Sequence, residues 1–255
     1  MSKNRLELFR KKRLTEISIR KGRAVKPSTV NRDVSNLRAM LNKAVEHAKI
    51  EVNPIGRIKL LEENNVRERV LSQDEFESLH LHCPPSLKGI VLIGFYLPMR
   101  QAEILNLTWK EIDLKMGFIR LGGERTKNKI GRNIPLHPRI IEFLRTCPRP
   151  IDGGYVFGNS RRFNRKAYNK AVESAGIADF NFHDLRHCAI NNMRLAGNDH
   201  FVIKQASGAK TDSAFQRYNL VTEQEMKSIK WLDEKSVKSG TMDTYMDTST
   251  KTKIV

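Results

Sequence analysis

The sequence predicts a mainly helical protein with a small antiparallel β-sheet, an α+β fold in two domains. Three observations carry this prediction. Apolar residues recur at helical spacing over residues 28–50, a mostly polar stretch follows at residues 62–70, and short apolar runs between glycines fill residues 118–136. At 255 residues the chain is long enough for one or two domains, each with a core of its own.

Residues 1–61 are predicted to form a small helical domain. Residues 1–27 contain 10 lysines and arginines against 2 acids, so we expect an exposed basic arm or a partly ordered helix there. Residues 28–50 give the clearest helix, because Val30, Val34 and Leu37 begin an apolar stripe along one face. A helix cannot bury such a stripe alone, so a small helical domain is implied.

A linker is predicted at residues 62–70 and a larger domain at residues 71–232. Ser72 and Glu75 have the spacing of a capping box, which marks a helix start. The glycine-marked runs at 118–121 and 132–136 are expected to be antiparallel strands. The remaining elements are expected to be helices at residues 87–97, 100–107, 139–145, 161–175, 183–196, 199–206 and 211–218. Residues 233–255, rich in Ser, Thr, Asp and Lys, are expected to be a flexible tail, or alternatively to pair with another subunit.

The charge balance indicates a polyanionic partner. The chain has 46 lysines and arginines against 28 acids, a net charge of +18, and such an excess is typical of proteins that bind nucleic acid. No apolar run reaches the ~18 residues of a membrane span, and an odd set of three cysteines favours reduced thiols. We therefore expect a cytoplasmic, nucleoid-associated protein with no membrane partner.

Residues 181–190 carry the most informative chemical groups. On a helix His183 and Arg186 share a face, where the guanidinium could hold a phosphate and the imidazole could move a proton near neutral pH. The alternative is an ordinary helix start with a packed histidine. His183 and His187 also have metal-ligand spacing, but no third ligand is evident and Arg186 would repel a cation. Neither a metal site nor a cofactor is expected.

Four distant segments, taken together, resemble the tyrosine recombinase or phage integrase family. They are residues 100–109, Thr126-Lys127, His183-x-x-Arg186 and Arg217-Tyr218, in that order along the chain. The resemblance covers residues 28–218 and implies a two-domain DNA clamp with an integrase-like catalytic domain. Such a protein, from a prophage or another mobile element, would integrate and recombine DNA by cutting and rejoining strands through a 3′-phosphotyrosyl intermediate.

The resemblance implies roles for the groups near the phosphate. Arg100 and Arg186 would clamp the scissile phosphate, and His183 would be a general base or a phosphate ligand. Charge that develops on phosphate oxygens is the main electrostatic demand of phosphoryl transfer, so paired guanidinium groups suit the task. Glu103 would orient Arg100, although a simple ion pair at this spacing is the alternative. His187 is expected to support the helix by packing or hydrogen bonding.

Tyr218 is the nucleophile that the resemblance implies. The ordinary pKa of a phenol is near ~10, so the positive field of the arginines would have to help it attack. Lys127 has the place of the acid that protonates the leaving 5′ oxygen, and Lys129 competes for that role. Taken alone, Tyr218 would be interpreted as a packed helix tyrosine, but Arg217 beside it matches the family pattern.

One position departs from the family pattern. A His or Trp normally stands nine residues before the nucleophile, and here that residue is Ala209. A methyl group cannot donate a hydrogen bond to phosphate, and losing one such donor can cost about 10²–10³ in rate. Activity is therefore expected to be weakened, absent or compensated from elsewhere. The N-terminal domain also departs, because it has less helix before residue 29 than the family usually has.

DNA contacts are expected from both domains. Side chains of the helix at residues 28–50 and of the basic segment at residues 161–166 would contact the phosphate backbone. They are Asn31, Arg32, Arg38, Arg161, Arg162, Arg165 and Lys166. The alternative for the basic segments is a solvated helix surface.

The resemblance implies double-stranded DNA as substrate, a homotetramer on DNA, and accessory DNA-bending or directionality proteins as further partners. Three other functions stay open. The first is a DNA-binding homologue whose catalysis Ala209 has weakened or removed. The second is a type IB topoisomerase, which shares this chemistry. The third is a basic protein that binds RNA or the ribosome.

Overall fold

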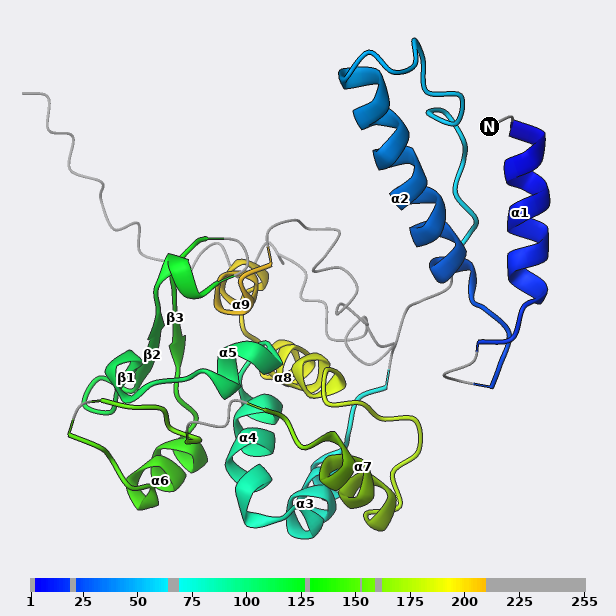
Figure 1. The fold of residues 1–255 in the computed structure, drawn as a ribbon. Helices are drawn as coiled ribbons and strands as arrows, with labels where there is room; N and C mark the ends of the chain where they lie inside the picture. The colour runs from blue at the N-terminus through cyan, green and yellow to red at the C-terminus, as the bar shows by residue number, and fades with distance from the viewer. Residues whose placement is uncertain are drawn as a thin grey trace, which may run out of the picture. The chain divides into compact units, whose positions relative to one another are not determined.

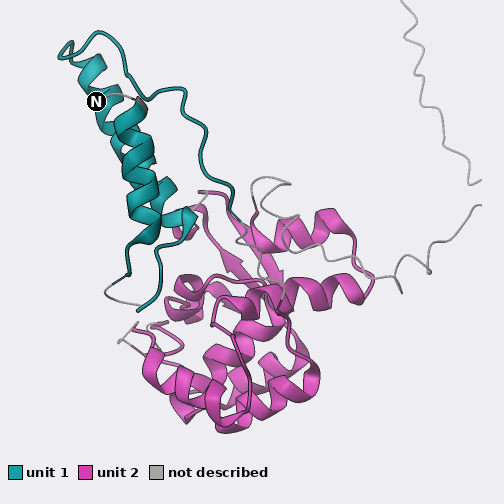
Figure 2. Ribbon diagram, turned by 90° about the vertical axis from the view of Figure 1, so that its right-hand side faces the viewer, with its two compact units in different colours: residues 1–67 teal, residues 68–255 magenta. Residues whose placement is uncertain are grey.

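The computed structural model describes residues 3–18, 22–63, 69–126, 129–151, 153–158 and 162–209 (Figure 1). The chain divides into two compact units, residues 1–67 and residues 68–255, which Figure 2 shows in two colours. Each unit has a cluster of buried apolar side chains of its own. None of the helices in the described ranges is long and apolar enough to cross a membrane.

The first unit is built on helices α1 (Lys3–Thr15) and α2 (Pro27–Glu46). Leu6 of α1, Val34 of α2 and Ile55 of the following segment are fully buried together. The side chains of Arg13 and Asp33 form an ion pair between the two helices at 3.1 Å. Of the two predicted alternatives for this stretch, an exposed basic arm or a partly ordered helix, residues 3–15 form a helix, to which Leu6 gives an apolar contact with α2.

The second unit combines helices with one small sheet. Its helices are α3 (Gln73–His82), α4 (Pro85–Tyr96), α5 (Gln101–Leu105), α6 (Pro138–Thr146), α7 (Arg165–Ser174), α8 (Asp184–Leu195) and α9 (His200–Ser207). Strands β1 (Ile112–Asp113), β2 (Phe118–Leu121) and β3 (Arg132–Pro135) form an antiparallel sheet in the order β1–β2–β3, in which Ile119 pairs with Ile112 on one side and Ile134 on the other. Two 3₁₀ turns, η1 (Trp109–Glu111) and η2 (Gly123–Arg125), come before β1 and after β2.

Helix α4 lies at the centre of the second unit's core. Residues 87 and 89–95 of this helix are buried, and the helix packs along α8 (Figure 1). Gly94 lets the two helices approach, because a Cβ at this position would lie only 3.2 Å from Leu185 Cδ1. On another face the ring of Phe95 stacks on Phe76 of α3 at 3.8 Å between centroids. This packing fixes the start of α8, which carries part of the candidate site.

Two local sequence signals are confirmed. Ser72 and Glu75 form a capping box at the start of α3: the Glu75 amide donates to Ser72 Oγ at 3.2 Å, and the Ser72 amide donates to Glu75 Oε2 at 2.9 Å. The predicted strands at 118–121 and 132–136 pair antiparallel as β2 and β3, so the mainly helical fold with a small antiparallel sheet is as predicted. Strand β1 was not anticipated. The predicted helix 211–218 and tail 233–255 lie outside the described residues.

Candidate active site

Three arginine side chains meet at the C-terminal end of α9, which lies beside α8 and β3 (Figure 1). Arg100 precedes α5, Arg132 begins β3 and Arg186 lies in the first turn of α8. Hydrogen bonds run from Arg132 Nε to the Ala206 carbonyl at 2.8 Å, from Arg186 Nη2 to that of Ser207 at 2.8 Å and from Arg100 Nη2 to that of Gly208 at 3.4 Å. The last carbonyls of a helix lack partners within it and carry partial negative charge, so they attract cations.

The ends of α9 follow from its sequence. Asp199 caps the start, where its side chain accepts hydrogen bonds from the amides of Phe201 at 2.8 Å and Val202 at 3.3 Å. Gly208 ends the helix in the left-handed conformation, with φ at +65° and ψ at +33°, which glycine adopts at low cost. A Cβ on Gly208 would lie 3.0 Å from Arg132 Nη1. Glycine at this position therefore ends the helix and leaves room for a guanidinium group.

Glu103 joins two of these arginines through one buried carboxylate. Oε2 accepts from the Arg100 amide at 2.7 Å and from Arg132 Nη2 at 2.7 Å, while Oε1 accepts from Arg100 Nη1 at 2.9 Å and Arg132 Nη1 at 3.3 Å. Burial alone would raise the pKa of Glu103, but the hydrogen bonds and charge of Arg132, aided by Arg100, outweigh it and lower the pKa below its usual value. The carboxylate is therefore ionised at neutral pH and holds both guanidinium groups in place.

Arg186 is fixed by backbone carbonyls at two points. The residue is only 4% exposed, and its guanidinium donates to the carbonyl of Pro98, just before α5, as well as to Ser207. The start of α8 sets its position, because the Asn181 amide donates to Asp184 Oδ2 at 2.8 Å in the first turn. The two arginines predicted to clamp phosphate are thus held at the same helix end by different anchors.

His183 lies beside the arginines, directly before α8, with its side chain exposed. Partial desolvation of the imidazole and the positive charges of Arg186 and Arg100 lower its pKa below the usual value, although Asp184 opposes the shift. A histidine with a lowered pKa is neutral at physiological pH and able to accept a proton. The His187 ring stands nearly perpendicular to it, at 79° and 5.8 Å between centroids.

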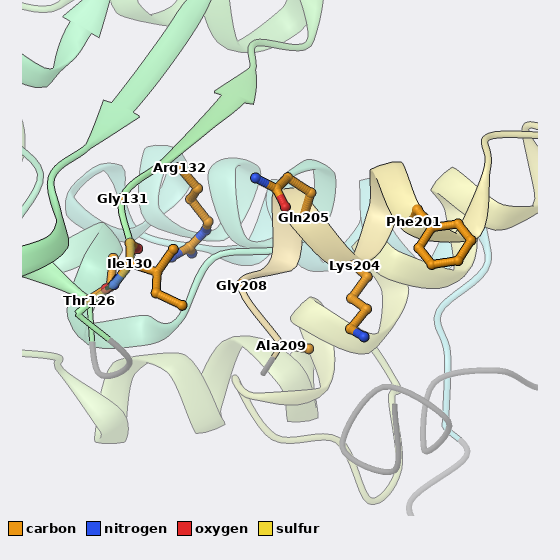
Figure 3. A pocket seen from close by; sticks show the side chains of 9 residues that line it. All are labelled: Thr126, Ile130, Gly131, Arg132, Phe201, Lys204, Gln205, Gly208 and Ala209. Atoms are coloured by element: carbon orange, nitrogen blue, oxygen red, sulfur yellow. Dashed lines mark hydrogen bonds between the residues drawn. The ribbon is translucent and has the colours of Figure 1, made fainter. Parts of the chain in front are cut away.

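A cavity of about 240 Å³ opens between the β2–β3 connection and α9 (Figure 3). It is lined by Thr126, Ile130, Gly131, Arg132, Phe201, Lys204, Gln205, Gly208 and Ala209. Ala209, the position that departs from the family pattern, presents a methyl group at one end of it (Figure 3). Thr126 on the other side directly precedes Lys127 in the sequence.

The structure brings together five of the predicted site residues: Arg100, Glu103, His183, Arg186 and His187. Lys127 and Tyr218 lie outside the described residues. Among the residues that are described, no three His, Cys, Asp or Glu side chains are grouped as metal ligands would be. Arg132 was missed by the sequence reasoning. The feature that could have identified it is strand alternation: Arg132 lies two residues before Ile134, so a charged residue occupies the same inward face of the strand as this buried apolar one.

The predicted DNA contact of Asn31 needs correction. Asn31 is 3% exposed and its amide group donates to the Leu61 carbonyl at 2.8 Å and accepts from the Leu61 amide at 2.8 Å, which ties the segment after α2 to the helix. Arg38 is half-buried and donates to the Ile58 carbonyl at 2.7 Å. Of the predicted contacts on α2, Arg32 alone has an exposed side chain.

The basic residues around α7 are exposed. Arg162, Arg165 and Lys166 lie at or just before the start of the helix, where Asn164 Oδ1 accepts from the Ala167 amide at 3.1 Å. Arg161, predicted with them, lies outside the described residues. This cap fixes the residue at which the helix starts. It therefore also fixes the backbone positions of the exposed basic side chains.

Comparisons with known proteins agree with this arrangement. The sequence pattern of the phage integrase family matches residues 69–225. A shufflon-specific DNA recombinase of Escherichia coli is 31% identical over 215 residues, which are 82% of this chain and 55% of that protein. An integrase of Salmonella phage P22 is 27% identical over 203 residues, 72% of this chain and 52% of that protein. The chain thus spans about half the length of these two relatives.

The fold has a counterpart among solved structures. A lambda integrase dimer bound to a COC′ core site superposes with a TM-score of 0.66 at 17% identity, over 91% of this chain and 67% of that one. At this identity the likeness bears on the fold. Because the family pattern covers well over half of the sequence and both arginines that carry the resemblance stand at one site, the chain belongs to the phage integrase family.

Proposed function

We propose that the protein is a site-specific DNA recombinase that cuts and rejoins strands through a 3′-phosphotyrosyl intermediate, with Tyr218 as the nucleophile. The observation that carries the proposal is the convergence of Arg100, Arg186 and His183 beside the end of α9. Two guanidinium groups and a neutral imidazole at one place form a site for a phosphate that reacts.

The chemistry assigns one task to each group. The Tyr218 oxygen attacks the scissile phosphorus and forms an O–P bond, while the bond from phosphorus to the 5′ oxygen breaks. His183 takes the phenol proton, and Lys127 gives a proton to the departing 5′ oxygen. Arg100 and Arg186 stabilise charge on the non-bridging oxygens, and their fixed anchors lower the cost of reorganisation during the reaction. The reverse attack by a 5′ hydroxyl rejoins a strand without ATP.

Double-stranded DNA is the proposed partner. The net charge of +18 supports it, as do the exposed cations Arg32, Arg162, Arg165 and Lys166. Within this proposal, residues 1–61 form a core-binding domain, residues 62–70 a linker and residues 71–232 the catalytic domain, followed by a tail. Four copies act on two duplexes at the nucleoid, assisted by DNA-bending or directionality proteins.

A nicked suicide duplex tests the proposal. Duplexes that bind the full chain would first be selected from a random-sequence pool, and then nicked close to the cleavage position so that the released fragment diffuses away. We expect a covalent protein–DNA band on a denaturing gel, and no band with Tyr218→Phe. Absence of the band despite good duplex binding would overturn the enzymatic assignment. Relaxation of an unrelated supercoiled plasmid would instead indicate a topoisomerase.

Ala209 favours a second candidate, a homologue that binds DNA but cuts it poorly. Its methyl group lines the cavity where a hydrogen-bond donor is normally expected. This candidate predicts duplex binding of ordinary strength with a very weak covalent band. A stronger band with Ala209→His would identify the missing donor as the cause.

A further inference from the structure

We propose that Arg132 is a positioning residue of the active site, which aligns Arg100 through Glu103 and holds the C-terminal end of α9 through Ala206. The inference rests on the proposed function, because it gives Arg132 a part in the same cleavage reaction. Arg132 has no direct role in the chemistry assigned above.

All three nitrogens of the Arg132 guanidinium donate hydrogen bonds in these two contacts. Its side chain is 2% exposed. Nη1 and Nη2 fork the two oxygens of Glu103 at 3.3 and 2.7 Å, and Nε donates to the Ala206 carbonyl at 2.8 Å. A planar fork with fixed donors holds both partners in one geometry.

The contact with Glu103 transmits this geometry to Arg100. Each oxygen of the Glu103 carboxylate accepts one hydrogen bond from Arg132 and one from Arg100. If Arg132 were removed, the carboxylate would lose two of these four hydrogen bonds and would be held by Arg100 alone. The Arg100 guanidinium, which follows the carboxylate, would then lose its fixed direction toward the phosphate.

The contact with α9 places the helix end against the same group. Ala206 is bonded by Arg132, and the next two carbonyls are bonded by Arg186 and Arg100. Gly208 lies so close over the Arg132 guanidinium that a Cβ there would be 3.0 Å from Nη1. Arg132 and Arg100 thus both contact the carboxylate and the helix end, and the bond to the helix is the shorter one for Arg132, at 2.8 Å against 3.4 Å.

Stability alone is a weak reason for this arrangement. Replacing a buried ion pair by apolar groups of similar volume is often neutral or stabilising for a fold. Arg132 starts the strand whose next inward residue is the fully buried Ile134, so an apolar side chain would suit that face. The value of the arginine is therefore in orientation. Its two hydrogen bonds to Glu103 and its bond to Ala206 orient Arg100 and the end of α9 toward the proposed phosphate position.

The test compares Arg132→Lys with a matched change, Arg139→Lys. Arg139 also forks a carboxylate, that of Glu77, and bonds Tyr96 Oη at 2.9 Å, on α3 and α4. Lysine keeps the charge in both variants but has no planar fork. Single-turnover formation of the covalent complex on the nicked duplex gives a rate constant and an amplitude for each protein.

We expect Arg132→Lys to lower the rate constant about 10- to 100-fold, the cost of misplacing a catalytic group by about 1 Å, with the amplitude and the duplex Kd preserved. Arg139→Lys should leave all three unchanged. A wild-type rate constant in Arg132→Lys would overturn the inference. So would a reduced amplitude at an unchanged rate constant, because that pattern reports only a smaller folded fraction.

Amide hydrogen exchange separates this inference from the proposed function. The Arg100 amide is bonded to the Glu103 carboxylate, and the Gly208 amide closes the last turn of α9. We expect faster exchange of both amides in Arg132→Lys and not in Arg139→Lys, even if the wild-type chain forms no covalent complex. Unchanged exchange at these amides would overturn the positioning role on its own.

Discussion

Glu103 is the acidic side chain that balances the positive charge of two arginines at the site, Arg100 and Arg132. Its carboxylate is 5% exposed and compensates the 2% exposed guanidinium of Arg132. It also accepts two hydrogen bonds from Arg100. A buried charge that loses its partner is costly, so the state of this carboxylate controls both the stability of the second unit and the direction of Arg100.

The lowered pKa of Glu103 makes stability depend on pH in a definite direction. Since the folded pKa lies below the unfolded one, the ionised carboxylate adds stability above the unfolded pKa and loses it as pH falls through the folded pKa. We expect the free energy of unfolding, measured in urea, to fall with acidification more steeply in the wild type than in Glu103→Gln. At neutral pH this variant should be destabilised by about 3–5 kcal/mol, because Arg132 stays buried without its partner.

The control for this prediction is Glu77→Gln. Glu77 pairs with Arg139 but its side chain is 44% exposed, and exposed pairs contribute about 0–1 kcal/mol. The substitution should therefore change stability little. Equal acid dependence in the wild type and in Glu103→Gln would contradict the role given to Glu103.

Ala209 yields a gain-of-function prediction. We expect Ala209→His to raise the rate of covalent complex formation by up to about 10²–10³, because the imidazole would supply the missing hydrogen-bond donor. Ala209→Val, which adds volume to the cavity without a donor, is the control and should give no increase. A similar gain in both variants would show that filling the cavity, rather than the donor, is what matters.

At the scale of elements, α9 is the piece on which the site is assembled. It is a helix of 8 residues, too short to be stable in isolation. Its cap at Asp199, its buried Ile203 and the three guanidinium groups at its other end therefore stabilise it together. The helix and the arginines depend on each other.

Gly208→Ala tests this dependence. Alanine at a positive φ is expected to cost about 1–2 kcal/mol, and its Cβ would in addition press on Arg132. Gly197→Ala is a matched control, because Gly197 has φ at +81° with no atom within 4 Å of the added Cβ. We expect urea unfolding to show similar losses of stability in the two variants, because both place alanine at a positive φ. Only Gly208→Ala should also slow covalent complex formation. Equal cleavage rates in both variants would contradict the coupling.

Much of the fold could be predicted because its signals are local. The capping box at Ser72 and Glu75 and the strands at 118–121 and 132–136 need only neighbouring residues. The two-residue strand β1 has too little pattern to be seen, and α1 shows only one fully buried side chain, Leu6, among many charges. Both depend on partners distant in the sequence.

The site was predicted in part for the same reason. Arg100, His183 and Arg186 stand in motifs, so a resemblance could find them. Arg132 stands in none, and its role depends on Ala206, which lies 74 residues away in the sequence. Asn31 was assigned to DNA together with Arg32 and Arg38 of the same helix, but its partner Leu61 lies 30 residues away in the sequence. Contacts of this range cannot be derived from local spacing.

For the whole molecule, positive charge is the dominant property. The net charge of +18 creates a field that attracts polyanions to the surface at long range. Some of this charge is used internally, as in Arg132 and Arg186, which are almost fully buried. Under the proposed function, the exposed cations would therefore set the affinity for DNA and its dependence on salt.

Salt titration tests the proposed DNA contacts of the exposed cations. We expect Arg165→Ala combined with Lys166→Ala to weaken duplex binding and to reduce the slope of log K against log salt by about 0.9 for each phosphate that the variant no longer neutralises. Asn31→Ala should leave the slope unchanged and instead destabilise the first unit, by about 1–3 kcal/mol, because it removes buried hydrogen bonds. An unchanged slope in the double variant would exclude α7 from the DNA interface.

The arginine bonds to the end of α9 also bear on when, during folding, the candidate site is assembled. The three guanidinium groups repel one another, and this repulsion is offset by the Glu103 carboxylate, which Arg100 and Arg132 share, and by the carbonyls at the end of the helix. An immature or partly melted molecule would thus lack the paired cations that phosphodiester cleavage demands. Under the proposed function, the ability to cleave DNA would therefore depend on the docking of α9.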